Sequence, residues 1–202
     1  MRVFGIRLKV STCLATVLFA AVRHDAFSED PEKMNTMRVI DFGAGASPWI
    51  SIDDVVMGGR SASVMEIERG IAVFRGEVSL ANNGGFASVR STPANYDLSD
   101  YDGLLLRLRG DGKRYAVRLR TTEDYAGVSY QIKIEPPDGE WRHVFLPFAE
   151  FEPVYRGRKV SGHPALDPTR VRTFGFMIAD TQEGRFRLEV EWLAASRKGA
   201  AR

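Results

Sequence analysis

Segments in which apolar and polar residues alternate recur along most of the chain. This period of two is typical of strands that bury one face. It occupies residues 71–74, 104–109, 115–120, 128–134 and 186–192, and residues 61–68 and 141–151 are also expected to contain strands. Residues 173–179 are apolar on both faces, which favours a central strand. No segment has a convincing helical period, so the pattern predicts an all-β domain.

A hairpin is predicted between residues 104–109 and 115–120, because Asp111-Gly112 is a favoured two-residue turn. In that register the apolar residues of both strands face one side. The opposite side would carry Arg107, Arg109, Arg114 and Arg118, together with Gln131 and Lys133 of the next strand. A basic row of this kind is typical of a solvated sheet face, and the alternative is a concave polar binding surface.

The segment from Asp53 to Ser61, with the sequence Asp-Asp-Val-Val-Met-Gly-Gly-Arg-Ser, follows neither period. Gly58 and Gly59 allow a positive φ or a close backbone approach, while Asp53 and Asp54 could accept backbone N–H bonds or bind a hard cation. The Val-Val-Met run is expected to be buried. The plainest interpretation is a special turn that leads into the strand at 61–68.

A second glycine-bearing segment, residues 82–90, contains Asn83, Gly84 and Gly85. Its Asn-Gly step is an ordinary turn signal. The two glycine-bearing segments could also rim one pocket. Among the aromatic residues, Trp49, Tyr125 and Tyr155 are expected to be exposed, whereas most of those in residues 141–151 are expected in the core.

The sequence offers no catalytic constellation. His143 lies in an expected strand and His163 in a loop, and neither has the partners of a triad or a metal site. A carboxylate hydrolase would need some of the acids to converge. The candidates are Asp53, Asp54, Asp97, Asp100, Asp102 and Asp180. We therefore predict a protein that is not an enzyme, with no catalytic residue, metal site or cofactor.

Composition fits one globular domain of a 202-residue chain, and its 19 glycines and 9 prolines suit many short strands joined by turns. We expect a leader at residues 1–26, a polar linker at 27–36, a domain at 37–195 and a disordered tail at 196–202. Cys13 is the only cysteine and lies in the expected leader, so the domain has no disulfide.

The leader begins with Arg2, Arg7 and Lys9 and continues into a short apolar run, which indicates an export signal that is either cleaved or kept as a membrane anchor. A mitochondrial presequence and a cytoplasmic start at Met34 or Met37 are the alternatives. Removal of residues 1–26 changes the formal net charge from +2 to −1. Bulk attraction to nucleic acid is therefore not expected.

Five motifs occur in order along the chain and together resemble the complex I intermediate-associated protein 30 family. They are Trp49 with residues 53–61, Asn83-Gly-Gly-Phe-Ala-Ser88, Arg109-Gly-Asp-Gly-Lys113, Trp141 with Leu146-Pro-Phe-x-x-Phe151, and Arg156-Gly157. The resemblance implies a jelly-roll β-sandwich of the galactose-binding-like kind. It also implies a non-enzymatic assembly factor for respiratory complex I with protein partners, and it supplies no catalytic residue.

Two hypotheses of binding follow. The first is a protein-binding or assembly module, and the second is a carbohydrate-binding module that uses Trp49, Tyr125 and Tyr130 on the basic sheet face. The candidate binding residues are Trp49, Asp53, Asp54, Gly58, Gly59, Ser61, Asn83, Gly84, Gly85, Arg107, Arg109, Arg118, Tyr130 and Arg156.

Overall fold

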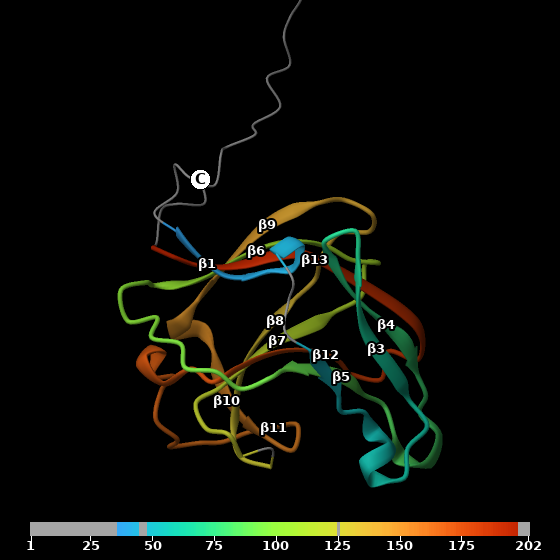
Figure 1. Cartoon of the computed structure of the whole chain (residues 1–202). Coiled ribbons are helices and arrows are strands. Elements are labelled where there is room, and N and C mark those ends of the chain that lie inside the picture. The colour runs from blue at the N-terminus through green and yellow to red at the C-terminus, as the bar shows by residue number, and fades with distance from the viewer. Residues whose placement is uncertain (1–35, 45–47, 125, 198–202) are drawn as a thin grey trace, which may run out of the picture.

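A computed structural model describes residues 36–44, 48–124 and 126–197, and in them the chain forms two antiparallel β-sheets packed face to face (Figure 1). The six-stranded sheet has the order β3-β4-β13-β6-β9, with β1 also paired to β13. The seven-stranded sheet has the order β11-β10-β8-β7-β12-β5-β2. The predicted all-β sandwich is confirmed. The expected leader and Tyr125 lie outside the described residues.

The strands of the six-stranded sheet are β1 (Thr36–Asp41), β3 (Ala62–Glu68), β4 (Ile71–Val78), β6 (Gly103–Arg109), β9 (Arg142–Pro147) and β13 (Gly184–Ser196). Those of the seven-stranded sheet are β2 (Trp49–Ser51), β5 (Ala87–Ser91), β7 (Tyr115–Arg120), β8 (Ser129–Ile134), β10 (Glu152–Tyr155), β11 (Arg158–Lys159) and β12 (Thr173–Ile178). Short 3₁₀ turns join them: η2 (Phe42–Ala44), η3 (Asp54–Met57), η4 (Ala81–Asn83), η5 (Phe148–Glu150) and η6 (Pro168–Arg170). In the described ranges no helix is long and apolar enough to cross a membrane.

One apolar core fills the space between the sheets. Alternate residues of β6 and β7, such as Leu106 and Val117, are fully buried in it, as are Phe174 and Phe176 of β12. The strand β12 lies between β7 and β5, so the prediction of a central strand at 173–179 is confirmed. Period-two burial of this kind turns the intervening side chains of each strand outward.

The predicted hairpin between β6 and β7 is wrong. The two strands lie in different sheets, because β6 pairs with β13 and β9, whereas β7 pairs with β8 and β12. Their apolar faces therefore meet across the core and not side by side. The row of arginines expected on one face is consequently divided, with Arg107 and Arg109 on the six-stranded sheet and Arg114 and Arg118 at the seven-stranded sheet.

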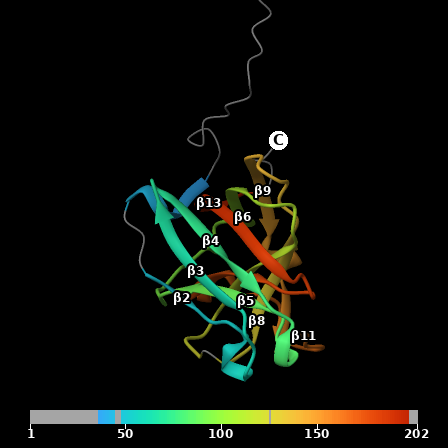
Figure 2. The same ribbon diagram turned by 90° about the vertical axis from the view of Figure 1, so that its right-hand side faces the viewer.

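The strand β13 holds the six-stranded sheet together, since β1, β4 and β6 all pair with it. Its last residue, Ser196, pairs with Thr36, the first residue of β1. Ser196 is thus part of the sheet, although the sequence assigned it to the tail. Seen from the side, β3 and β4 descend toward η3 and β5 at one edge of the sandwich (Figure 2).

Candidate functional site

The Asp54 carboxylate is buried beside η3 and accepts hydrogen bonds from two distant segments. Ser61 donates from its backbone N–H at 2.8 Å and from its hydroxyl at 2.5 Å. The backbone N–H groups of Gly85 and Phe86 donate at 2.7 and 3.2 Å. Asp54 is 0% exposed, so these four bonds replace its hydration.

Asp53, the residue before Asp54, also accepts hydrogen bonds from two segments that are distant in the sequence. Its carboxylate accepts from the N–H and hydroxyl of Ser63 in β3, at 2.8 and 2.6 Å, and from the N–H of Ser88 in β5 at 3.0 Å. Because β3 and β5 belong to different sheets, Asp53 bridges the two layers at this edge of the sandwich. The two carboxylates thus brace the fold, and their oxygens are occupied by N–H and O–H donors.

Two glycines are required by the space around Asp54. A Cβ atom on Gly59 would lie 2.3 Å from Asp54 Oδ1, and a Cβ atom on Gly84 would lie 2.6 Å from Asp54 Oδ2. Gly58 is needed for a different reason, because its φ of +90° ends η3 in the left-handed region. The unusual composition of residues 53–61 is therefore explained by a buried carboxylate wrapped closely in backbone.

Burial acts to raise the pKa of Asp54, but the hydrogen bonds from Ser61, Gly85 and Phe86 together outweigh it and hold that pKa below its ordinary value. The carboxylate is consequently charged at neutral pH. A group kept ionised in this way suits a structural anchor and does not suit a general acid.

The apex of η3 is an exposed apolar tip, which we define as Val55, Val56 and Met57. These side chains are 62%, 73% and 65% exposed, respectively. The prediction that this run is buried is wrong, because the turn closes on the carboxylate of Asp54 and directs the next three side chains to solvent. A cluster of three exposed apolar residues on a firmly anchored turn is a feature typical of contact surfaces.

A groove of about 630 Å³ runs over the outer face of the seven-stranded sheet, next to the apolar tip. Its floor comes from β5, β12, β7 and β8, and its two sides come from η3 with residues 84–86 and from the loops at 126–127 and 156–157. The lining includes Val56, Met57, Gly84, Gly85, Phe86, Arg90, Arg114, Arg118, Arg120, Lys133, Arg156, Met177 and Asp180. The groove therefore combines apolar walls with an excess of basic groups.

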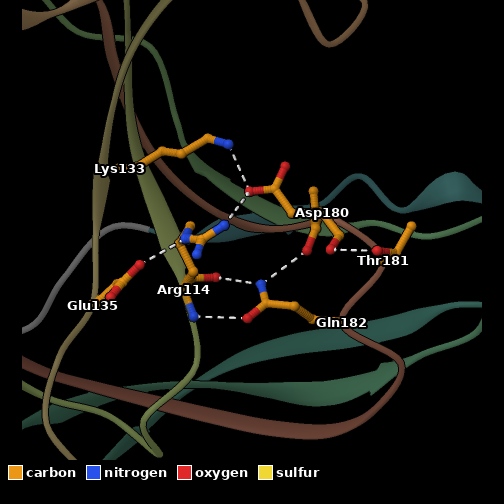
Figure 3. Close-up of polar contacts among 7 residues, drawn as sticks. Arg114, Lys133, Glu135, Asp180, Thr181 and Gln182 are labelled. Atoms are coloured by element: carbon orange, nitrogen blue, oxygen red, sulfur yellow. Dashed lines mark hydrogen bonds and ion pairs between the residues drawn. The ribbon is translucent and has the colours of Figure 1, made fainter.

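At one end of the groove the basic groups are neutralised. Asp180 Oδ2 lies 2.6 Å from Lys133 Nζ and 3.6 Å from an Arg114 guanidinium nitrogen, and Glu135 accepts from Arg114 at 2.8 Å (Figure 3). Gln182 accepts from the backbone N–H of Arg114 and donates to its carbonyl oxygen. The hydrogen bond and charge of Glu135 are the main causes that raise the pKa of Arg114.

At the other end, Arg90, Arg118 and Arg120 form a cluster around Gly175, which we call the arginine cluster. Gly175 faces Arg90 across β5 and Arg118 across β7, and its missing side chain leaves a hollow of about 10 Å³. Arg118 donates to the Ser129 hydroxyl at 2.6 Å, and Arg120 donates to the carbonyl of Gly127. Burial and the nearby charge of Arg90 lower the pKa of both Arg118 and Arg120 to about 10.

The structure brings some of the predicted site residues together and separates others. Arg118, Gly84, Gly85 and Arg156 line the groove. Asp53, Asp54, Ser61, Gly58 and Gly59 shape the braced edge beside it, and the Asn83 residue, with a φ of 58°, belongs to the neighbouring turn.

Other predicted site residues lie away from the groove. Arg107 and Arg109 stack on Trp141 at the six-stranded sheet. Trp49 stacks on Phe176 at 5.6 Å, and Tyr130 is only 4% exposed, so the expectation that their rings are available on the basic face is wrong.

Sequence reasoning missed Arg90 and Arg120 as members of the site. In the sequence both arginines alternate with core residues, as polar residues on a solvent-exposed strand face do. What sets them apart from such residues is their grouping around Gly175 in the structure. A cue was present, because Gly175 interrupts an otherwise bulky strand. Within the described ranges, no group of three or more His, Cys, Asp or Glu residues is placed to hold a metal ion.

Comparison with known sequences gives matches across most of the sandwich. A model of the protein family described as complex I intermediate-associated protein 30 matches residues 40–190. An uncharacterized protein of Schizosaccharomyces pombe is 29% identical over 72% of this chain and 76% of its own length. The mitochondrial complex I intermediate-associated protein 30 of Drosophila melanogaster is 27% identical over 77% of this chain, and that of Mus musculus is 27% identical over 72%. The chain spans 61% and 51% of the lengths of these two animal relatives.

Comparison with solved structures gives carbohydrate-binding modules. A family 11 module from a cellulosomal cellulase of Clostridium thermocellum superposes with a TM-score of 0.59 at 16% identity, covering 81% of this chain and 95% of the module. The same family's module in complex with a mixed-linked tetrasaccharide gives 0.58 at 17% identity, covering 80% and 96%. At these identities the likeness is one of fold, and it confirms the predicted jelly-roll sandwich of the galactose-binding-like kind.

Proposed function

Because this chain belongs to the complex I intermediate-associated protein 30 family, we propose that it is a non-enzymatic protein-binding factor that assists the assembly of respiratory complex I, NADH:ubiquinone oxidoreductase. The observation that carries the proposal is the family match over residues 40–190, which includes strands of both sheets. The fly and mouse relatives are named as proteins associated with complex I intermediates.

The apolar tip and the groove beside it supply a surface suited to such a role. Val56 and Met57 belong to both features, since they are exposed and also line the groove. The bonds of Asp53 and Asp54 hold η3 in place before any partner binds. A partner would therefore lose little conformational entropy of this turn on association.

Carbohydrate binding is less well supported than protein binding. The sugar-stacking residues that the sequence nominated include Trp49 and Tyr130, and both rings pack toward the core. The groove lining is rich in arginine, and among the described residues its aromatic members are Phe86 and Tyr115, of which Tyr115 is 1% exposed. The similarity to carbohydrate-binding modules concerns the fold and carries no ligand over to this chain.

Gene deletion in the source organism tests the proposal. Loss of the protein is expected to lower NADH:ubiquinone oxidoreductase activity and to leave partly assembled complex I in native gels. The wild-type chain should restore assembly, whereas the double variant Val56→Asp, Met57→Asp should not. Substitution of these exposed residues is expected to leave the melting temperature nearly unchanged, so a failure to restore would reflect lost binding.

A matched control uses apolar residues exposed on a different strand. Val64 and Ile67 of β3 are 37% and 44% exposed, and the variant Val64→Asp, Ile67→Asp should restore assembly as the wild type does. Normal amounts of mature complex I in the deletion strain would overturn the proposal.

The location of the protein depends on the leader, which the sequence allows to be interpreted as an export signal or as a mitochondrial presequence. The names of the fly and mouse relatives support the mitochondrial alternative. Mass spectrometry of the N-terminus of the native protein distinguishes a removed leader from an uncleaved one and from an internal start, and subcellular fractionation then distinguishes export from mitochondrial import. A start near residue 27 indicates a removed leader, Met1 indicates an uncleaved one, and Met34 or Met37 indicates a cytoplasmic product.

A further inference from the structure

We propose that the groove binds an acidic segment of a partner protein, with one carboxylate of that segment seated against Arg90, Arg118 and Arg120. The inference rests on the proposed protein-binding function and adds the chemistry of what is bound. Its basis is the arginine cluster, in which basic side chains converge on a hollow in the floor of a groove with apolar walls.

The hollow is formed by the register of three strands. Arg90 of β5 and Arg118 of β7 both lie opposite Gly175 of β12, and Arg120 lies opposite Thr173 two residues along the same strand. All of these residues line the hollow. A side chain at position 175 would enter this space, which Arg90, Arg118 and Arg120 also line.

Arg118 has hydrogen-bonding capacity that its own fold does not use. Its two terminal nitrogens bond to the Ser129 hydroxyl and to the Met177 sulfur, whereas its Nε is buried without a hydrogen-bond partner. A buried donor of a charged group without an acceptor is costly. An acceptor oxygen that entered the hollow from the groove would relieve that cost.

Charge gives a second, independent indication. The hydrogen bonds of Arg118 and Arg120 go to a hydroxyl, a thioether and two carbonyl oxygens, all of which are neutral groups. Arg120 is 6% exposed. Burial, together with repulsion from Arg90, lowers the pKa of both side chains to about 10. The charge of Asp124 acts on Arg120, but among the described residues no carboxylate accepts a hydrogen bond from Arg118 or Arg120, in contrast to the contacts of Asp180 at the other end.

The surroundings favour a carboxylate on a polypeptide over other anions. A hollow of about 10 Å³ holds roughly one oxygen atom, and arginine forms charge-assisted bonds to carboxylates with a defined geometry. Val154, Met177 and Met57 line the groove outside the hollow and offer apolar contacts to the rest of the bound segment. A side chain of an extended segment can reach the floor of a groove, whereas the headgroups of a flat membrane surface remain at the rim.

A peptide array tests this inference with the full chain as the probe. One set of peptides carries a central Glu flanked by randomised apolar residues, and the matched set carries Gln at the same position. We expect binding to the Glu set at least tenfold above the Gln set, and we expect it to weaken as ionic strength rises. Equal binding to both sets would overturn the inference.

The variant Arg118→Met is the decisive substitution. It removes a partly buried charge while filling a similar volume, so the variant is expected to be at least as stable as the wild type in urea unfolding. It should lose at least tenfold in binding to the Glu set. Arg107→Met removes the same charge from the six-stranded sheet and should bind as the wild type does. If Arg118→Met retains full binding, the carboxylate does not lie in the arginine cluster.

Nuclear magnetic resonance of the arginine Nε–H groups gives a direct readout that does not depend on any substitution. Addition of a soluble peptide from the Glu set should shift the Arg118 Nε–H signal, whereas the Gln peptide should leave it in place. Titration with inorganic phosphate and with vesicles containing phosphatidylglycerol completes the experiment. A shift caused by phosphate or vesicles but not by the Glu peptide would overturn the proposal of a protein ligand.

The experiment on acidic-peptide binding and the experiment on complex I assembly can fail independently of each other. If the deletion strain fails to assemble complex I but acidic peptides do not bind, the assembly role survives and this inference fails. If acidic peptides bind through Arg118 while the deletion strain assembles complex I normally, the inference stands and the assembly role fails.

Discussion

The Asp54 side chain connects separate backbone segments at the edge of the sandwich through its hydrogen bonds. Four donors from Ser61, Gly85 and Phe86 converge on a carboxylate that is completely buried. We predict that Asp54→Asn lowers the free energy of unfolding by about 2–4 kcal/mol at pH 7, because an amide nitrogen would face N–H donors. Urea unfolding measures this loss. Asp97→Asn, at an exposed turn, serves as the control and should change little.

The same residue predicts a pH dependence. The folded-state pKa of Asp54 is lowered, so its stabilisation is complete above the unfolded pKa of about 4 and is lost as the pH falls through the folded value. The difference in unfolding free energy between wild type and Asp54→Asn should therefore shrink as the pH is lowered from 6 to 3. A difference that is constant over this range would mean that the charge of Asp54 contributes nothing.

The glycine pair next to Asp54 makes a matched comparison. Gly59→Ala should cost about 2–3 kcal/mol, because the new Cβ would overlap a carboxylate that four bonds hold in place. Gly58→Ala should cost about 1 kcal/mol, because no atom lies within 4 Å of its Cβ position and only the positive φ is strained. Thermal unfolding of the two variants compares them. The reverse order would argue against close packing around Asp54.

At the scale of the strands, the alternating pattern identified most elements but not their partners. Residues 104–109 and 115–120 are both strands with one apolar face, and either a hairpin or two opposed sheets buries those faces. Sequence periodicity states which side of a strand is buried, and not what buries it. The Asp111-Gly112 step favoured the hairpin, whereas the chain crosses at that point from one sheet to the other.

The candidate site was predictable to a similar extent. The segment at 53–61 was recognisable because it follows neither period, yet the donors to its carboxylates include Gly85, Phe86 and Ser88, which lie more than 30 residues away along the chain. Its bracing role and the exposure of Val55–Met57 depend on that long-range arrangement. The grouping of Arg90 with Arg118 depends in turn on the register of β12 between their two strands.

An ion network crosses the outer face of the six-stranded sheet and gives a prediction at this scale. Glu189 of β13 accepts at 2.6 Å from Arg109 of β6 and at 2.6 Å from Arg187, which also reaches Glu68 of β3. Glu189 is 7% exposed, so Glu189→Gln should cost about 1–3 kcal/mol. Urea unfolding with the exposed Arg75–Glu66 pair as control checks this, since Glu66→Gln should cost less than about 1 kcal/mol. Equal losses of unfolding free energy in Glu189→Gln and Glu66→Gln would mean that burial does not strengthen the contribution of Glu189.

Across the whole molecule, the two sheets share one apolar core and are joined at an edge by Asp53 and Asp54. Outside this core, the described residues of the six-stranded sheet form a much smaller apolar cluster, made of Leu105, Trp192 and Ala194 with Phe145 packed against it. The groove lies on the outer face of one sheet, and it is shaped by loops that the core and the braced edge hold together. Loss of the shared core should dismantle the groove and both sheets at once.

Tryptophan fluorescence tests whether the two sheets unfold together, because Trp49 reports on the seven-stranded sheet and Trp192 on the six-stranded sheet. In a Trp141→Phe background, one variant keeps only Trp49 and another keeps only Trp192. We expect each fluorescence midpoint in urea to coincide with the far-ultraviolet circular dichroism midpoint of the same variant, because a shared core makes unfolding all-or-none. If the Trp192 signal changed at a different urea concentration from the circular dichroism signal, the sheets would unfold separately. The edge bonds of Asp53 and Asp54, and not the shared core, would then be the main connection between them.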